Sequence, residues 1–123
     1  MEQDSKNSSL DKVRSHLQRE CFNKLFIGGK FVEPIEREKL PTYYPATGEL
    51  LHEFPRGKAN DIHAAISAAE RAWAAGTWAA MRAVDRAKIV AKMAQGIEDN
   101  KEMLAEIEAA DVGKPFRQAA MTL

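Results

Sequence analysis

Cysteine is almost missing from this sequence of 123 residues, which contains only Cys21. One cysteine cannot form a disulfide within the chain, and a zinc site normally takes several Cys or His ligands at set spacings. We therefore expect neither a disulfide framework nor a zinc centre. A reducing cytosol is the simplest compartment for such a chain, and we predict a cytoplasmic protein.

The sequence also lacks a net charge and long apolar segments. Its 18 basic and 18 acidic residues give a formal net charge of zero, and a chain without a field of one sign is a poor partner for nucleic acid or acidic lipid. No run approaches the roughly 20 apolar residues that span a bilayer. Residues 1–19 contain three acidic side chains and no unbroken apolar stretch, which argues against a secretory signal and an acid-poor mitochondrial presequence. We expect no nucleic-acid or membrane partner.

The beginning of the chain predicts one short amphipathic helix. Residues 1–8 are polar, and we expect them to be disordered, with Ser8 or Ser9 capping the helix that follows. Apolar residues then recur at intervals of three and four, which is one face of a helix. They are Leu10, Val13, Leu17 and Cys21. We interpret Cys21 as an apolar-face residue of this helix rather than as a reactive thiol, because no partner that would activate it lies beside it in the sequence.

Two β-hairpins are predicted next. Residues 25–27 and 30–32 flank Gly28-Gly29, and two glycines permit the positive φ angles of a tight turn. Residues 33–40 are charged and bracketed by Pro34 and Pro41, which predicts an exposed loop. The second hairpin joins residues 42–44 to residues 49–54 through a turn with Pro45 and Gly48.

Three helices complete the predicted order. The first begins at Asn60 as N-cap and ends at Gly76, the second covers residues 85–99, and the third ends at Gly113. Their expected buried positions are Ile62, Ile66, Ala69 and Trp73, then Ile89, Val90, Met93 and Ile97, then Met103, Leu104 and Ile107. The fold class as the chain stands is therefore α+β: an N-terminal helix, two β-hairpins and three helices. Because alanine is dense in residues 64–80 and buries little area, these helices call for a larger partner to pack on.

Three segments, in this order, resemble the aldehyde dehydrogenase superfamily. They are Phe26-Ile27-Gly28-Gly29-Lys30-Phe31-Val32, Tyr44-Pro45-Ala46-Thr47-Gly48-Glu49 and Asp111-Val112-Gly113-Lys114-Pro115. The second and third are similar to the Asn-Pro-Ala-Thr-Gly-Glu and Asp-Asn-Gly-Lys-Pro motifs of that family. Tyr44 and Val112 depart from the usual asparagines, and Val84 departs from the usual Ser or Thr helix cap. The order of the three segments is more specific than any one of them.

The resemblance implies a division of the chain and a parent fold. Residues 1–24 are a polar N-terminal extension with the short helix, residues 25–118 are the N-terminal part of an aldehyde dehydrogenase domain, and residues 119–123 are a truncated end that is still helix-like. A full-length parent would have the α/β aldehyde dehydrogenase fold. It would oxidise an aldehyde to a carboxylic acid with NAD or NADP.

The family's catalytic cysteine, glutamate base and cofactor-contacting residues lie beyond residue 123. We therefore predict no catalytic and no cofactor-binding residue here, no cofactor for this chain alone, and no activity. Gly28-Gly29 lies in a hairpin and not at a strand-to-helix turn, so it is no phosphate loop. Lys114 is interpreted as a cation that complements the end of a helix dipole.

One site may be carried over in part from the resemblance, namely a cation held through backbone carbonyls and a carboxylate. Its positions map to Thr42, Tyr43 and Asp111. Other clusters have simpler interpretations: Glu106, Glu108 and Asp111 are expected to be solvated or capping, because helical residues two apart point in different directions. The three histidines, His16, His52 and His63, lie on separate predicted elements without metal-ligand spacing.

Three functional readings stay open at this point. The first is the N-terminal fragment of an NAD(P)-dependent aldehyde dehydrogenase, with Trp73 and Trp78 as apolar anchors against the rest of the enzyme. The second is a short isoform that acts as an interaction module on full-length dehydrogenase subunits. The third is a small independent α+β domain that shares only the pattern.

Overall fold

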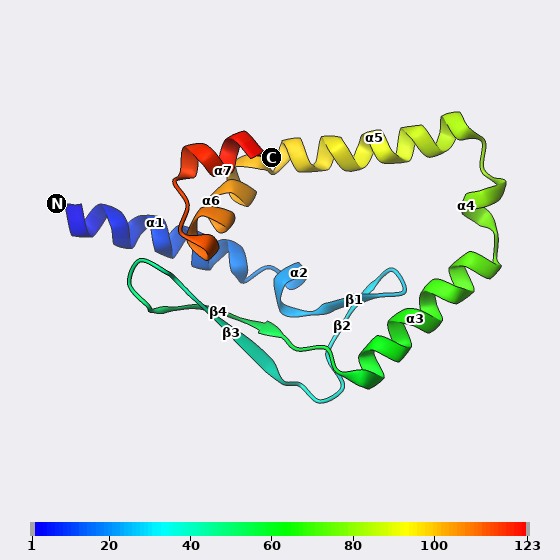
Figure 1. The fold of residues 1–123 in the computed structure, drawn as a ribbon, viewed down its shortest axis with the longest axis horizontal. Coiled ribbons are helices and arrows are strands. Elements are labelled where there is room, and N and C mark those ends of the chain that lie inside the picture. Colours follow the sequence, from blue (N-terminus) through cyan, green and yellow to red (C-terminus); the bar gives the residue numbers. More distant parts are fainter. Residues whose placement is uncertain (1, 123) are drawn as a thin grey trace.

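The computed structural model describes residues 2–122, with side chains from Ser9 onward, as a small core from which a long helical arm extends (Figure 1). Met1 and Leu123, the outer limits of the predicted extension and of the predicted end segment, lie outside the described residues. The helices are α1 (Glu2–Leu17), α2 (Glu20–Asn23), α3 (Ala59–Ala74), α4 (Thr77–Ala80), α5 (Ala83–Asp99), α6 (Lys101–Val112) and α7 (Phe116–Thr122). The strands are β1 (Leu25–Ile27), β2 (Lys30–Val32), β3 (Lys39–Tyr43) and β4 (Leu50–Pro55).

The core forms where α1 packs against α6 and β4. Its buried side chains are Leu10, Val13, Leu17, Leu51 and Ala110, and the half-buried side chains of Phe22, Tyr44, Phe54 and Ile107 pack around them. The predicted apolar face of α1 is confirmed for its first three members. Its start is not: the helix begins at Glu2 and not after Ser8 or Ser9, because a helix that is nucleated on docked turns can be extended by polar residues.

Cys21 does not lie on the apolar face of α1, contrary to the prediction. The helix ends at Leu17, where the side-chain amide of Asn23 donates to the backbone oxygens of Leu17 (2.7 Å) and Arg19 (2.8 Å). These bonds satisfy carbonyls that a continuing helix would use, so the chain turns and restarts as α2. Cys21 is exposed there as a free thiol.

Both predicted hairpins are present as antiparallel pairs, β1 with β2 and β3 with β4. Gly28 (φ 61°) and Gly29 (φ 80°) take the positive φ angles that the first turn requires. Strand β3 begins at Lys39 and contains Pro41, so the predicted loop of residues 33–40 is too long. A proline is tolerated there because each strand of a two-stranded sheet has a free side, on which a missing N–H costs no ladder bond.

The arm comprises α3, α4 and α5, residues 59–99, and swings away from the core as an open hoop (Figure 1). Glycines at positive φ follow two of the predicted helices, Gly76 (φ 65°) after α3 and Gly113 (φ 74°) after α6, as predicted. The short helix α4 lies where only a link was predicted. The N-cap of α3 is Lys58 and not Asn60, because the carboxylate of Asp61 accepts the backbone N–H of Lys58 (3.0 Å).

The apolar faces of the arm are uncovered. Ile66 is 50% exposed, Trp73 85% and Met93 66%, and α5 has no buried residue. The predicted burial of Ile62, Ile66 and Trp73 on α3 and of Ile89, Val90, Met93 and Ile97 on α5 is therefore wrong within the described residues, because no element of residues 2–122 packs over these faces. Within those residues, no helix combines the length and the apolar character needed to cross a membrane.

Candidate functional site

The second and third sequence motifs meet in space where β3 and its turn contact the end of α6. We call this place the motif junction and define it by Thr42, Tyr43, Pro45, Asp111 and Gly113. The hydroxyl of Thr42 donates to Oδ1 of Asp111 (2.7 Å), across 69 positions of sequence. The structure thus brings together two of the three predicted cation-site residues, and the third, Tyr43, is next to Thr42 on the strand.

Local backbone geometry explains why the turn has its shape. The backbone N–H of Tyr44 donates to the carbonyl of Glu49 (2.8 Å), and that of Gly48 donates to the carbonyl of Tyr44 (2.8 Å). Gly48 has φ 74°, a left-handed conformation that glycine adopts without steric cost. This places Pro45 at the tip of the hairpin, facing α6.

Gly113 meets Pro45 at close range. A Cβ atom at position 113 would lie 3.3 Å from the Cβ of Pro45, and the residue also has a positive φ. Both the backbone conformation and the contact therefore require glycine at this position. The two motifs are complementary parts of one packing arrangement, which gives a structural reason for their occurring together.

The carboxylates near the junction point to separate partners. Glu106 pairs with Lys12 (2.6 Å) and with Nε2 of His16 (3.1 Å) on α1, while Glu108 pairs with Lys114. Among the described residues there is no group of three or more His, Cys, Asp or Glu side chains that could hold a metal ion. The prediction that Glu106, Glu108 and Asp111 do not form one cluster is confirmed.

Lys114 does more than complement a helix dipole. Its Nζ pairs with Glu108 on α6 and donates to Oγ1 of Thr122 (3.0 Å) on α7. The ammonium group therefore ties the last two helices together. The three histidines stay apart, as predicted: His16 faces Glu106, His52 lies edge-on to Phe54 with ring centroids 4.9 Å apart, and His63 is exposed on α3.

Two features were missed by the sequence reasoning. One is a hollow of about 430 Å³ between α1, the turn after β3, and the helices α6 and α7. The other is Asp61, whose carboxylate is buried. A carboxylate at the third position of a helix is a known capping pattern and could have identified Asp61. The hollow has no such signal, because its walls come from opposite ends of the chain.

Comparison with known proteins identifies the class to which this arrangement belongs. The profile described as "Aldehyde dehydrogenase family" matches residues 31–123. Mitochondrial benzaldehyde dehydrogenase of Antirrhinum majus is 37% identical over 99 residues, which cover 80% of this chain and 18% of that protein. Aldehyde dehydrogenase 1 of Tanacetum cinerariifolium is 40% identical over 98 residues, with 80% and 20% covered.

Solved structures show the same relationship. Betaine aldehyde dehydrogenase of Staphylococcus aureus, in complex with NAD+, superposes with a TM-score of 0.84 at 26% identity, over 92% of this chain and 22% of that one. An aldehyde dehydrogenase variant of Bacillus cereus superposes with a TM-score of 0.81 at 39% identity, over 89% and 22%. The chain belongs to the aldehyde dehydrogenase family, and its mixture of helices and small sheets is part of the α/β fold of that family. It spans about a fifth of the length of these relatives.

Proposed function

We propose that this chain is the N-terminal part of an NAD(P)-dependent aldehyde dehydrogenase, in which it supplies structure rather than catalysis. The whole enzyme would oxidise an aldehyde to a carboxylic acid. The carrying observation is the uncovered apolar surface of the arm, since large exposed apolar patches mark contact surfaces. Its side chains are Ile62, Ile66, Trp73, Trp78, Val84, Val90, Met93 and Ile97.

The chain by itself is expected to be inactive. Aldehyde oxidation of this kind needs an activated thiolate, a base for the attacking water and a bound nicotinamide cofactor. The single thiol, Cys21, is exposed on α2 and lies outside residues 31–123 that match the family profile. We expect no aldehyde-dependent formation of NADH or NADPH by the purified chain, and turnover with either cofactor would contradict the proposal.

The arm is the part that we expect to dock on the rest of the enzyme. The test mixes this chain with an aldehyde dehydrogenase of the family that lacks its own N-terminal fifth, and follows complex formation by size-exclusion chromatography. Ile66→Asp, on the exposed face of α3, is expected to abolish the complex. The matched control is Leu40→Asp on β3, because Leu40 is as exposed (48%) as Ile66 (50%) but lies outside the arm. Equal loss with both variants would contradict docking through the arm.

The alternative is an interaction module that binds intact dehydrogenase subunits. The same uncovered arm supports it, because its apolar faces could be covered by another chain as well as by a continuation of this one. The two proposals differ in one outcome. Co-elution with a full-length subunit favours the interaction module, whereas an intact subunit whose own N-terminal part already covers the docking surface would leave this chain unbound.

The motif junction also supports a cation site formed by the Asp111 carboxylate and the backbone carbonyls of Thr42 and Tyr43. Hard cations prefer such oxygen ligands and take about six of them, so binding to this chain would be weak. Titration with K⁺, Na⁺ and Mg²⁺ is expected to raise the melting temperature, and Asp111→Asn should remove that response. A melting temperature independent of all three ions would exclude the site.

We propose the cytosol as the compartment, on the basis of the single unpaired cysteine. Relatives named mitochondrial, chloroplastic and peroxisomal show that the family occupies several compartments. Fluorescence microscopy of a tagged chain in its own cells tests this, and accumulation in an organelle would overturn it.

A further inference from the structure

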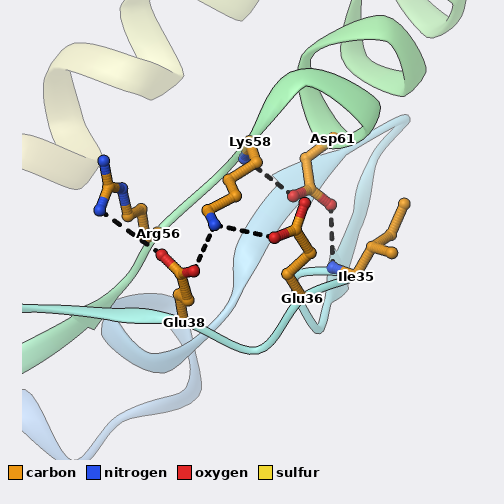
Figure 2. A network of polar contacts seen from close by, with 6 residues as sticks. All are labelled: Ile35, Glu36, Glu38, Arg56, Lys58 and Asp61. Atoms are coloured by element: carbon orange, nitrogen blue, oxygen red, sulfur yellow. Dashed lines mark hydrogen bonds and ion pairs between the residues drawn. The ribbon is translucent and has the colours of Figure 1, made fainter.

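A polar network lies at the point where the arm leaves the core (Figure 2). We call it the root network, and it consists of Ile35, Glu36, Glu38, Arg56, Lys58 and Asp61. Its centre is Asp61 near the start of α3, with only 4% of the residue exposed. Among the side chains described, it is the only buried polar or charged residue. A buried carboxylate is costly unless its oxygens are hydrogen-bonded, so its partners show what it is for.

Each oxygen of the Asp61 carboxylate holds a backbone N–H from a different segment. Oδ1 accepts from Ile35 (3.1 Å), in the loop between β2 and β3, and Oδ2 accepts from Lys58 (3.0 Å), immediately before α3. Hydrogen bonds to an ionised acceptor are roughly twice as strong as neutral ones. One side chain of α3 therefore fastens the helix to the loop that joins the two hairpins.

The other side chains repeat this connection. Nζ of Lys58 donates to Oε2 of Glu36 (2.8 Å) and also to Glu38. Arg56 donates its backbone N–H to the carbonyl of Glu38 (2.8 Å), and its guanidinium lies 3.5 Å from the same residue's carboxylate. Residues 35–38 and 56–61 are thus joined through both backbone and side chains, as Figure 2 shows.

Apolar packing contributes little to the direction of the arm. Apart from the root network, α3 approaches the first hairpin, where a Cβ at Gly28 would meet Ala68 at 3.6 Å. At its other end the arm meets α6 through a short joint at Asn100. The faces of α3 and α5 that would otherwise anchor the arm by burial are exposed.

We propose that the root network, through Asp61, presets the direction in which the arm leaves the core before the arm has a partner. Ordering a segment in advance lowers the entropy that docking costs. The purpose of this device rests on the proposed docking role, whereas the device itself is a property of this chain alone. Asp61 is therefore a positioning residue, and its effect is measurable without any partner.

The test measures the spread of distances between the core and the arm in the isolated chain. One spin label is attached to Cys21, the only native cysteine and exposed on α2, and the other to Lys92→Cys on the exposed surface of α5. Double electron–electron resonance gives the distance distribution. We expect a narrow distribution for the parent pair and loss of its main peak into a broad distribution with Asp61→Asn, because an amide cannot accept both N–H groups.

Asp85→Asn is the matched control. The Asp85 carboxylate pairs with Arg82 (2.7 Å) and Lys88 (3.3 Å), both within or next to the first turns of α5, so it does not join the arm to the core. The control distribution should stay as narrow as that of the parent. Broadening of the same extent with Asp85→Asn would overturn the proposal.

Lys58→Met provides a second variant in case Asp61→Asn fails to fold. It removes the ion pairs to Glu36 and Glu38 but keeps both backbone bonds to Asp61, so we expect partial broadening and a native circular dichroism spectrum. If Asp61→Asn folds and keeps the parent distribution, or if Lys58→Met does so while Asp61→Asn does not fold, the network does not set the direction of the arm. Neither outcome depends on whether the arm docks on a dehydrogenase.

Discussion

Leu17 holds the core together more than any other single side chain. It is the one large side chain among those described that is fully enclosed, at 0% exposure, and it lies where α1 ends over the β3–β4 hairpin and α6. The core has few other large members, so the loss of this one cannot be made good by its neighbours.

We predict that Leu17→Ala lowers the free energy of unfolding by about 2–5 kcal/mol, because it removes buried apolar volume and leaves a cavity. Urea unfolding followed by circular dichroism measures this change. The control is Leu40→Ala, at a side chain that is 48% exposed on β3, for which we expect a much smaller loss. Similar losses for both variants would show that the core does not depend on α1.

His52 makes the stability of the core depend on pH. Burial, and after it the nearby charge of Lys39, lowers the pKa of this imidazole below its usual value. Its Nε2 is buried without a hydrogen-bond partner. Since the unfolded state binds the proton more readily, this residue leaves the fold unaffected above its unfolded pKa and destabilises it as the pH falls through that value.

We predict that the melting temperature falls as the pH is lowered from about 7.5 to about 5.5, across the ordinary histidine pKa. His52→Phe should reduce this fall, because an apolar ring of similar size does not titrate. His63→Gln, at an exposed histidine on α3, is the control that should retain it. His16 is present in both variants, so the difference between them isolates His52. An equal fall in both would contradict the assignment.

At the scale of elements, two glycines with opposite surroundings test how the helices end. Gly113 has φ 74° and lies against Pro45, whereas Gly96 lies inside α5 with open space around its missing side chain. We predict that Gly113→Ala destabilises the chain by about 1–2 kcal/mol, the cost of a left-handed alanine. Gly96→Ala should raise helicity and stabilise by about 0.5–1 kcal/mol. Thermal melts of both variants check the signs, and a stabilising Gly113→Ala would contradict the packing at the motif junction.

Elements were predictable where their cause is local. The Gly28-Gly29 turn, the helix stops at Gly76 and Gly113, and the apolar spacing of α1 depend on residues a few positions apart. The early start of α1 at Glu2 was not predictable, since residues 2–8 have no apolar repeat to mark a docked face. The extension of β3 through Pro41 depends on its being one of only two strands, which local sequence does not reveal.

The whole molecule has a small core and a long uncovered arm, and its two tryptophans both report on the arm. Trp73, at the end of α3, is 85% exposed, and Trp78, on α4, is 50% exposed. An apolar arm open to water has contacts to make elsewhere, and indole rings are common anchors at such contacts.

We predict that the isolated chain has tryptophan emission typical of water-exposed indole, strong quenching by acrylamide, and binding of a hydrophobic dye. Docking on a dehydrogenase lacking its N-terminal fifth should shift the emission to the blue and reduce quenching. Trp73→Phe should remove the larger part of the accessible signal, because Trp73 is the more exposed ring. Blue-shifted emission and weak quenching in the isolated chain would contradict an uncovered arm.

The sequence by itself determined the hairpins, the helix stops and the membership of the aldehyde dehydrogenase family, because turn chemistry, periodicity and ordered motifs are properties of neighbouring residues. Only the tertiary structure decided that Thr42 meets Asp111, that Asp61 fastens the arm, and that the apolar face of α5 stays exposed. Periodicity shows that a helix has a face to bury, but whether that face is covered depends on which other elements reach it in space.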